Sequence, residues 1–213
     1  MKRKNLLFAV IFALGIATLA CSLLPVPNTT IITSLTPTFT PAVPPLRPTT
    51  ANMGLISENL IAVIPPGFEM GFESQEGGFI MNEMVPTGET IDNWTTMITV
   101  EIFLGEKTVT PQQYQQMLTE RWFGACENSE SYPVADGEEN GYPFVLWQLY
   151  CPLNGSLQTV EYTYLKAIQG NDSFYLVQVA FRHEPSNDEI TQWMQYLKGV
   201  QVCDSRIPER ACP

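Results

Sequence analysis

The sequence predicts an α+β domain in which an antiparallel sheet is packed with helices. Two observations carry this prediction. Strand-like runs, rich in β-branched and aromatic residues and bounded by turn residues, dominate the C-terminal three quarters of the 213-residue chain. Two further segments, one in the middle and one near the end, have helical periodicity and a capping box at their start. Strands and helices mixed in this order favour α+β over an alternating α/β arrangement.

The first strands are expected in the N-terminal part of the domain. "AVIPPGFEMGFES" (62–74) and "GGFIMNEMVP" (77–86) predict two strands joined around "QEGG". "NWTTMITVEIFLG" (93–105) alternates and predicts a third strand. Its apolar face is expected to carry Ile98, Val100, Ile102 and Leu104.

The segment 110–126, "TPQQYQQMLTERWFGAC", predicts the first helix. Thr110 is a suitable N-cap, Pro111 suits the first turn, and Gln113 completes a capping box. The apolar stripe that should face the core consists of Tyr114, Met117, Leu118, Trp122 and Ala125.

Four more strand-like runs and a last helix follow. The expected strands are "YPVA" (132–135), "YPFVLWQLYC" (142–151), "LQTVEYTYLKAIQ" (157–169) and "SFYLVQVAFR" (173–182), the last two joined by the turn "GND". The final helix should begin at the capping box Ser186–Glu189 and end at Gly199. Its expected buried residues are Ile190, Trp193, Met194 and Leu197.

This succession of elements resembles the PsbP-like α/β/α sandwich over most of residues 55–203. The stretches "IPPGF", "ENGYPFVLWQLYCPLN" and "AIQGNDSFYLVQVAFR" are also similar to a set of uncharacterised exported bacterial proteins. The first resemblance implies a sheet covered by helices, and the second implies export. Neither implies any catalytic or ligand-binding residue.

The N-terminus predicts export and lipidation. Lys2, Arg3 and Lys4 precede an uncharged apolar run that is short for a membrane span, which is typical of a cleaved signal. Thr18, Leu19, Ala20 and Cys21 fit a lipobox, with Thr18 departing from the usual leucine. Cys21 is therefore expected to carry a lipid, palmitate among its acyl chains, that anchors the protein to a membrane. The alternative is a plain secretory signal that leaves Cys21 as a free thiol.

Three regions are thus expected: a lipoprotein signal peptide at 1–20, a lipid-anchored Thr/Pro-rich disordered linker at 21–52, and a single globular domain at 53–213. Residues 22–50 contain eight Thr, seven Pro and no acidic residue, a composition typical of a semi-extended spacer. Removal of the signal changes the formal net charge from −11 to −14. This acidity argues against nucleic acid as a partner and against adsorption to anionic headgroups.

The remaining cysteines predict two structural disulfides outside the cytosol. Cys126, Cys151, Cys203 and Cys212 allow three pairings, of which Cys126–Cys151 and Cys203–Cys212 are preferred. The first pairing would tie the end of the middle helix to a core strand, and the second would close the short loop "CDSRIPERAC". Metal or redox chemistry is the competing interpretation, but the chain lacks C-x-x-C spacing and has a single histidine.

Few residues indicate chemistry. Asp136, Glu138 and Asn140 echo the first half of a calcium loop, but Trp147 stands at the twelfth position, so a hairpin turn is the preferred interpretation of "DGEENG". His183 is expected on the surface, without a nucleophile motif beside it.

Carboxylates and tryptophans give two more candidates. Glu101 and Glu161 lie within strands and could form a carboxylate pair for glycoside hydrolysis, or lie on solvated faces. Trp122, Trp147 and Trp193 are expected in the core. Trp94 is expected to be partly exposed and is the candidate aromatic for a ligand.

The leading functional hypothesis is a non-enzymatic, exported lipoprotein in a bacterial envelope whose acidic domain binds a partner, such as an envelope protein, or assists envelope assembly. No cofactor is expected. The alternatives are a carboxylate-based hydrolase acting on cell-envelope material, and a module that binds a small ligand or a cation.

Overall fold

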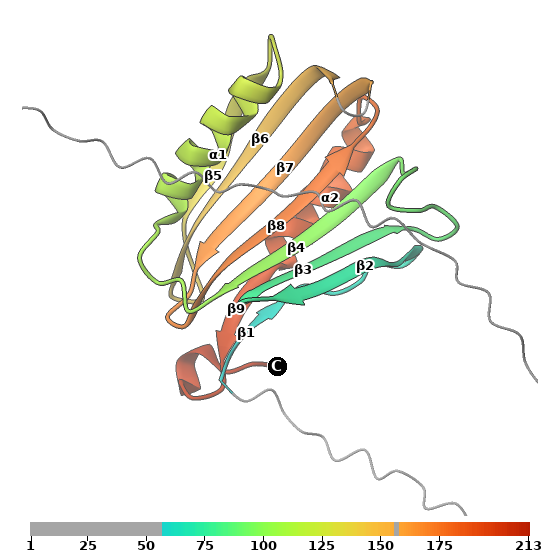
Figure 1. The fold of residues 1–213 in the computed structure, drawn as a ribbon. Helices are drawn as coiled ribbons and strands as arrows, with labels where there is room; N and C mark the ends of the chain where they lie inside the picture. Colours follow the sequence, from blue (N-terminus) through green and yellow to red (C-terminus); the bar gives the residue numbers. More distant parts are fainter. Residues whose placement is uncertain (1–56, 156–157) are drawn as a thin grey trace, which may run out of the picture. The chain divides into compact units, whose positions relative to one another are not determined.

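The computed structural model describes residues 57–155 and 158–213 (Figure 1). The predicted signal peptide, Cys21 and the linker 21–52 lie outside these residues. In the described part, no helix is long and apolar enough to cross a membrane.

A seven-stranded antiparallel sheet forms the centre of the domain, in the order β2-β3-β4-β8-β7-β6-β5. Its strands are β2 (Phe68–Glu76), β3 (Phe79–Pro86), β4 (Thr96–Leu104), β5 (Glu130–Glu139), β6 (Tyr142–Asn154), β7 (Thr159–Gln169) and β8 (Ser173–Phe181). A separate two-stranded sheet pairs β1 (Glu58–Ile61) with β9 (Gln201–Asp204). The helices are α1 (Pro111–Ala125), α2 (Asn187–Gly199) and the short 3-10 turn η1 (Pro208–Arg210). The α+β class and the antiparallel sheet are therefore confirmed.

The two helices cover opposite faces of the large sheet, as Figure 1 shows for α1 in front and α2 behind. On the α1 face, Tyr114, Leu118 and Trp122 pack on buried residues of β6, β7 and β8. On the α2 face, Trp193 and Leu197 belong to the larger core, which reaches from β4 across to β6. Two apolar cores on one sheet make a three-layer α/β/α arrangement, which is the layering that the sequence resemblance implies.

Burial on both faces explains where simple alternation fails as a guide. In β8 every residue except Gln178 is buried, because a helix or loop covers each side. In β4, Ile98 and Val100 are buried and Ile102 is partly buried as expected, but Leu104 lies exposed at the end of the strand. Met97 and Thr99, on the other face of β4, are buried as well.

Both predicted helices are present with their capping boxes. Thr110 accepts from the Gln113 amide, and Ser186 accepts from the Glu189 amide. The apolar stripe of α1 is shallower than expected, since Met117 and Ala125 are exposed. Helix α1 lies over one side of its face of the sheet, so only the residues that point straight down reach the core.

The acidic segment "DGEENG" is mostly strand. Asp136 to Glu139 extend β5, and the turn consists of Asn140 and Gly141, whose φ angles of 50° and 75° suit a tight hairpin. The Asn140 amide donates to Val202 O at 2.8 Å, which ties this hairpin to β9. Strands β1 and β9 were not expected from the sequence.

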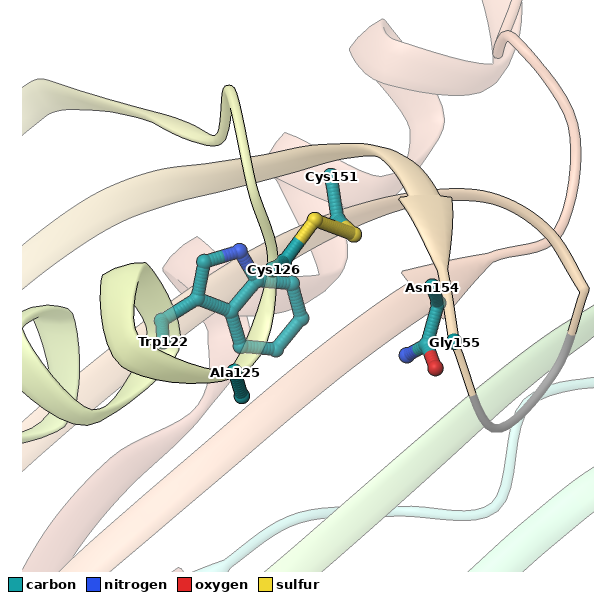
Figure 2. Close-up of a pocket in the computed structure, with 6 residues that line it drawn as sticks. All are labelled: Trp122, Ala125, Cys126, Cys151, Asn154 and Gly155. Atoms are coloured by element: carbon teal, nitrogen blue, oxygen red, sulfur yellow. A yellow bond between two sulfur atoms is a disulfide. The ribbon is translucent and has the colours of Figure 1, made fainter.

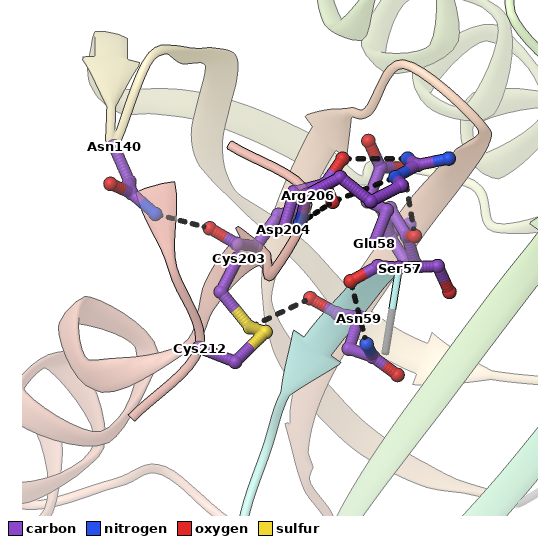
Figure 3. The surroundings of a disulfide bond; sticks show 10 residues. Ser57, Glu58, Asn59, Asn140, Cys203, Asp204, Arg206 and Cys212 are labelled. Atoms are coloured by element: carbon purple, nitrogen blue, oxygen red, sulfur yellow. Dashed lines mark hydrogen bonds and ion pairs between the residues drawn. A yellow bond between two sulfur atoms is a disulfide. The ribbon is translucent and has the colours of Figure 1, made fainter. Parts of the chain in front are cut away.

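The two disulfides pair as predicted. Cys126–Cys151 joins the C-terminal end of α1 to β6 across 25 residues, and Cys203–Cys212 closes 9 residues after β9 (Figure 3). A chain-entropy estimate gives about 3.5 kcal/mol of stabilisation for the longer loop and about 2.6 kcal/mol for the shorter one. The disulfides thus fix the two segments that have least of the main sheet around them.

Candidate functional site

The largest described hollow, the α2 cavity, lies between the edge of the sheet and helix α2 and has a volume of about 320 Å³. It is lined by Val134, Ala135, Glu139, Phe144, Leu146, Lys166, Met194, Leu197 and Lys198. These residues meet here because alternate positions of β5, β6 and β7 point to the α2 face, while α2 covers the middle strands and leaves the edge uncovered. Most of the wall is apolar, with charges at its floor and rim.

Lys166 forms the charged floor of the α2 cavity. The residue is 1% exposed, and its ammonium group donates to Glu139 Oε2 at 2.5 Å, to Leu197 O at 3.0 Å and to Val200 O at 2.8 Å. Burial lowers the pKa of Lys166, and the hydrogen bond and charge of Glu139 oppose that shift. The three donors of the ammonium are therefore occupied. Lys166 joins the C-terminal end of α2 to the sheet and offers no free donor to an anionic ligand.

Three tyrosines continue the same face of the sheet beyond the α2 cavity. This tyrosine cluster consists of Tyr132 on β5, Tyr150 on β6 and Tyr162 on β7. The register places Tyr150 opposite Tyr162, and Tyr132 opposite Gln148, so all of them point to the α2 face. The rings of Tyr150 and Tyr162 lie 4.7 Å apart with a 40° tilt. Tyr132 is 47% exposed, and the other two are partly exposed, so aromatic surface is accessible here.

Acidic groups flank the tyrosine cluster. The Tyr132 hydroxyl donates to the Glu130 carboxylate. Burial raises the pKa of Tyr162, and the neighbouring Tyr150 and the charge of Glu184 raise it further. The cluster is therefore an aromatic surface in a negative field.

A second, smaller cavity of about 220 Å³ lies beside the Cys126–Cys151 disulfide (Figure 2). Trp122, Ala125, Asn154 and Gly155 complete its lining. The Trp122 indole stands next to the disulfide in Figure 2, and its N–H donates to Tyr150 O at 3.4 Å. The two cysteines are oxidised, and the six lining residues carry no ionisable side chain. This cavity holds no acid, base or thiolate among its walls.

The predicted carboxylate pair does not form. Glu101 lies opposite Leu176, which lies opposite Ala167, and Glu161 is six residues further along β7. Six strand residues correspond to about 20 Å, too far for two acids to act on one glycosidic bond. Glu161 instead accepts from Asn154 and Thr163. Burial raises the pKa of Glu161, and these two hydrogen bonds oppose the shift.

A different pair of acids meets on the α1 face. Glu83 on β3 lies opposite Thr99, which places it beside Glu101 on the same face of the sheet. Burial raises the pKa of both carboxyl groups; for Glu101 a hydrogen bond from Tyr114 opposes the shift and the charge of Glu83 adds to it. The sequence contained no signal for this pair, because it depends on the register between β3 and β4.

Trp94 is not the exposed aromatic that the sequence predicted. It is 7% exposed and packs with Val85, Met97 and Ala180. The Arg182 guanidinium lies 4.0 Å from its ring centroid, so a cation–π contact covers it. The expectation failed because the loop 87–95 folds back onto the sheet. Trp147 and Trp193 are buried and Trp122 packs against the core, as expected.

His183 is half-exposed, at the entry to α2. Its Nε2 lies 3.0 Å from Glu189 Oε1, and its ring packs edge-on against Phe181. This carboxylate also caps α2, so the histidine contacts a structural group rather than a nucleophile.

The candidate cation ligands lie apart from the described carboxylate cluster. Asp136 and Glu138 lie on the exposed edge strand β5, and the Asn140 amide is bonded to Val202 O. Elsewhere, Glu58, Asp172 and Asp204 bring oxygens within 4.8 Å of one another. Arg206 already supplies positive charge there, 2.5 Å from Asp172 and 2.6 Å from Asp204, as Figure 3 shows for Asp204.

Comparisons with known proteins give no family. No family model matches the chain, and no curated protein matches it. Three solved structures are similar in part. LpqN, described as involved in cell envelope biogenesis of Mycobacterium tuberculosis, is 13% identical, with 72% of this chain and 86% of that chain covered and a TM-score of 0.43. A mutant of the protein Mog1 is 14% identical over 64% and 78% of the two chains, with a TM-score of 0.39. The Ran-binding protein Mog1p of Saccharomyces cerevisiae is 12% identical over 67% and 85%, with a TM-score of 0.37. Similarity this distant assigns no function.

Proposed function

We propose that this protein is an exported lipoprotein of a bacterial envelope, held at a membrane by lipid on Cys21, whose acidic domain binds a partner rather than catalysing a reaction. The lipobox and the Thr/Pro-rich linker support the anchor. Two disulfides in a small domain are typical of an oxidising compartment outside the cytosol.

The α2 cavity is the observation that carries the binding function. Val134 at its rim is 45% exposed, and Tyr132 next to it along β5 is 47% exposed. Accessible apolar and aromatic side chains around a hollow are typical of a surface that a partner covers. The carboxylate pair expected for a hydrolase is separated by about 20 Å, which favours binding over glycoside hydrolysis.

The test is affinity capture of the full-length protein from its own envelope, with Val134→Glu as the disrupting variant. Leu153→Glu is a matched control, because Leu153 is an exposed apolar residue (59%) on β6 that does not line the α2 cavity. We expect Val134→Glu to reduce partner recovery at least about tenfold, which corresponds to the loss of one interface contact of roughly 1.4 kcal/mol. The Leu153→Glu variant should keep wild-type recovery.

Equal recovery by both variants would show that the α2 cavity is not the binding surface. Recovery no greater than that obtained with an unrelated lipoprotein would remove the binding function itself.

A further inference from the structure

We infer that the α2 cavity and the tyrosine cluster together bind a proline-rich, basic peptide segment of a partner protein in the polyproline II conformation. This inference rests on the proposed binding function and adds the class of partner. Four features of the site carry it: its length, its aromatic chemistry, its charge and the irregular edge of the sheet beside it.

The two parts of the site are spaced for an extended peptide. Tyr150 and Leu146 lie on the same face of β6, four residues apart, which corresponds to about 13 Å. Polyproline II advances about 3.1 Å per residue, so about four peptide residues span this distance. One proline pair can contact the tyrosine cluster while an apolar residue about one turn further along enters the α2 cavity.

Tyrosines suit proline in two ways. Their rings provide flat apolar surface against which pyrrolidine rings pack, and their hydroxyls donate to backbone carbonyls. Polyproline II has no internal backbone hydrogen bonds, so its carbonyls are free to accept. Aromatic-lined grooves recognise this conformation because little chain entropy is lost on binding.

The charge near the tyrosine cluster selects a basic segment. Glu130 lies against Tyr132, and Glu184 acts on Tyr162, within a chain of formal net charge −11. The lysines of the α2 cavity do not reverse this field at the tyrosine end: Lys166 is paired with Glu139, and Lys198 lies at the opposite end of the site. An arginine or lysine of the partner is therefore expected next to the tyrosines.

The edge of the sheet argues against the other common way of binding an extended peptide. A partner strand that adds to β5 needs a regular ladder of free backbone groups. Pro133 has no N–H, and the bulge at Val134 shifts the register between Pro133 and Ala135. Side chains on the α2 face, rather than the backbone of β5, are left to make the contact.

A carbohydrate is the competing ligand for exposed tyrosines. The rings of Tyr150 and Tyr162 are tilted by 40° and only 4.7 Å apart, so they pack on each other instead of forming one flat platform for a sugar ring. The geometry therefore favours the peptide.

The experiment is calorimetric titration of the purified full chain with a synthetic peptide of repeated Pro-x-x-Pro units and one arginine. Two altered peptides serve as probes, one with the arginine replaced by alanine and one with the prolines replaced by alanine. Tyr132→Ala is the disrupting variant. Phe123→Ala is the control, since Phe123 is similarly exposed (48%) but lies on α1, on the opposite face of the sheet.

We expect the parent peptide to bind, with Kd raised at least fivefold by Tyr132→Ala and unchanged by Phe123→Ala. Both altered peptides should bind at least fivefold more weakly, and added salt should weaken the parent peptide. Absence of binding, equal binding of the alanine peptide, or binding of chitin and peptidoglycan oligosaccharides that Tyr132→Ala abolishes would each overturn the inference. Partner capture that is lost in Val134→Glu would still stand in these cases, so failure of this inference is distinguishable from failure of the binding function.

Discussion

At the scale of single residues, Glu58 shows how one buried side chain joins distant parts of the chain. Its carboxylate accepts from the backbone amides of Asn171, Asp172 and Ser173 and from the Tyr175 hydroxyl, 113 to 117 residues later. It thereby ties β1 to the hairpin between β7 and β8. Gly170 is needed beside it, because a Cβ atom at that position would collide with Glu58 Oε1.

We predict that Glu58→Gln lowers the free energy of unfolding by about 1–3 kcal/mol, because an amide group turns donors toward donors and leaves buried N–H groups without an acceptor. Denaturant unfolding at neutral pH measures the change. Glu73→Gln, an exposed glutamate on the edge strand β2, is the control and should stay within about 0.5 kcal/mol of wild type. A loss as small in Glu58→Gln as in the control would contradict this role.

No sequence pattern could have identified Glu58, since its partners are set by the fold. The same holds for Lys166, whose neighbours in β7 indicate an ordinary core strand. In contrast, the disulfide pairing could be predicted, because elements close in the chain bring Cys126 near Cys151 and Cys203 near Cys212.

At the scale of elements, helix starts were the most predictable feature. A capping box is a local interaction between residues three apart, so Thr110–Gln113 and Ser186–Glu189 could be read directly from the sequence. In α2 the Glu189 carboxylate accepts from the Ser186 amide and hydroxyl and lies beside His183. The Ser186 backbone amide, then its hydroxyl and then His183 lower the pKa of Glu189 to about 2.

We predict that Glu189 stabilises the domain above pH 4.5, its ordinary pKa, and that this contribution is lost as the pH falls from there to about 2. The sign follows because the folded state favours the ionised carboxylate, so the unfolded state binds the proton more tightly. Glu189→Gln should therefore flatten the pH dependence of the unfolding free energy in this window and lower stability at pH 7. The loss at pH 7 should be about 0.5–1 kcal/mol, the size of a capping interaction at an exposed site.

Unfolding of wild type and variant by urea at a series of pH values checks this prediction. Asp188→Asn is the control, because Asp188 lies in the same first turn without a capping bond of this kind. An unchanged slope between pH 4.5 and about 2 in Glu189→Gln would show that another group carries the acid dependence.

Strand lengths were less predictable than helix starts. β5 was expected over four residues and extends over Glu130–Glu139, because a hairpin partner can pair residues whose own propensity is low. β1 and β9 were missed, since each is only four residues long and is stabilised by the other. Trp94 was misjudged for a similar reason: the loop that carries it packs on a sheet face whose cover the sequence does not reveal.

At the scale of the whole molecule, the domain is a sheet with a different function on each side. The α1 face holds the Cys126–Cys151 disulfide and two partly buried acids, Glu83 and Glu101. The α2 face holds the α2 cavity and the tyrosine cluster, the surface proposed for binding. The lipid on Cys21 is proposed to restrict this surface to the vicinity of a membrane.

The anchor is checked by labelled palmitate incorporation in cells that express the full chain. We expect wild-type protein to carry label and to sediment with membranes, and Cys21→Ala to lose the label completely. Cys203→Ala with Cys212→Ala is a control for the other thiols and should keep the label, because those cysteines are paired with each other. Label that persists in Cys21→Ala would show that the lipobox assignment is wrong.

The sequence alone determined the predicted address, the α+β class, the helix starts and the disulfide pairs, because each depends on composition or on residues that are near one another in the chain. Only the tertiary structure decided which acids meet, that Trp94 is covered, that Lys166 is buried and that three tyrosines adjoin an apolar cavity. These features depend on strand register and on which helix covers which face. A shift of one residue in register reverses the face of every side chain in a strand, so local sequence cannot specify them.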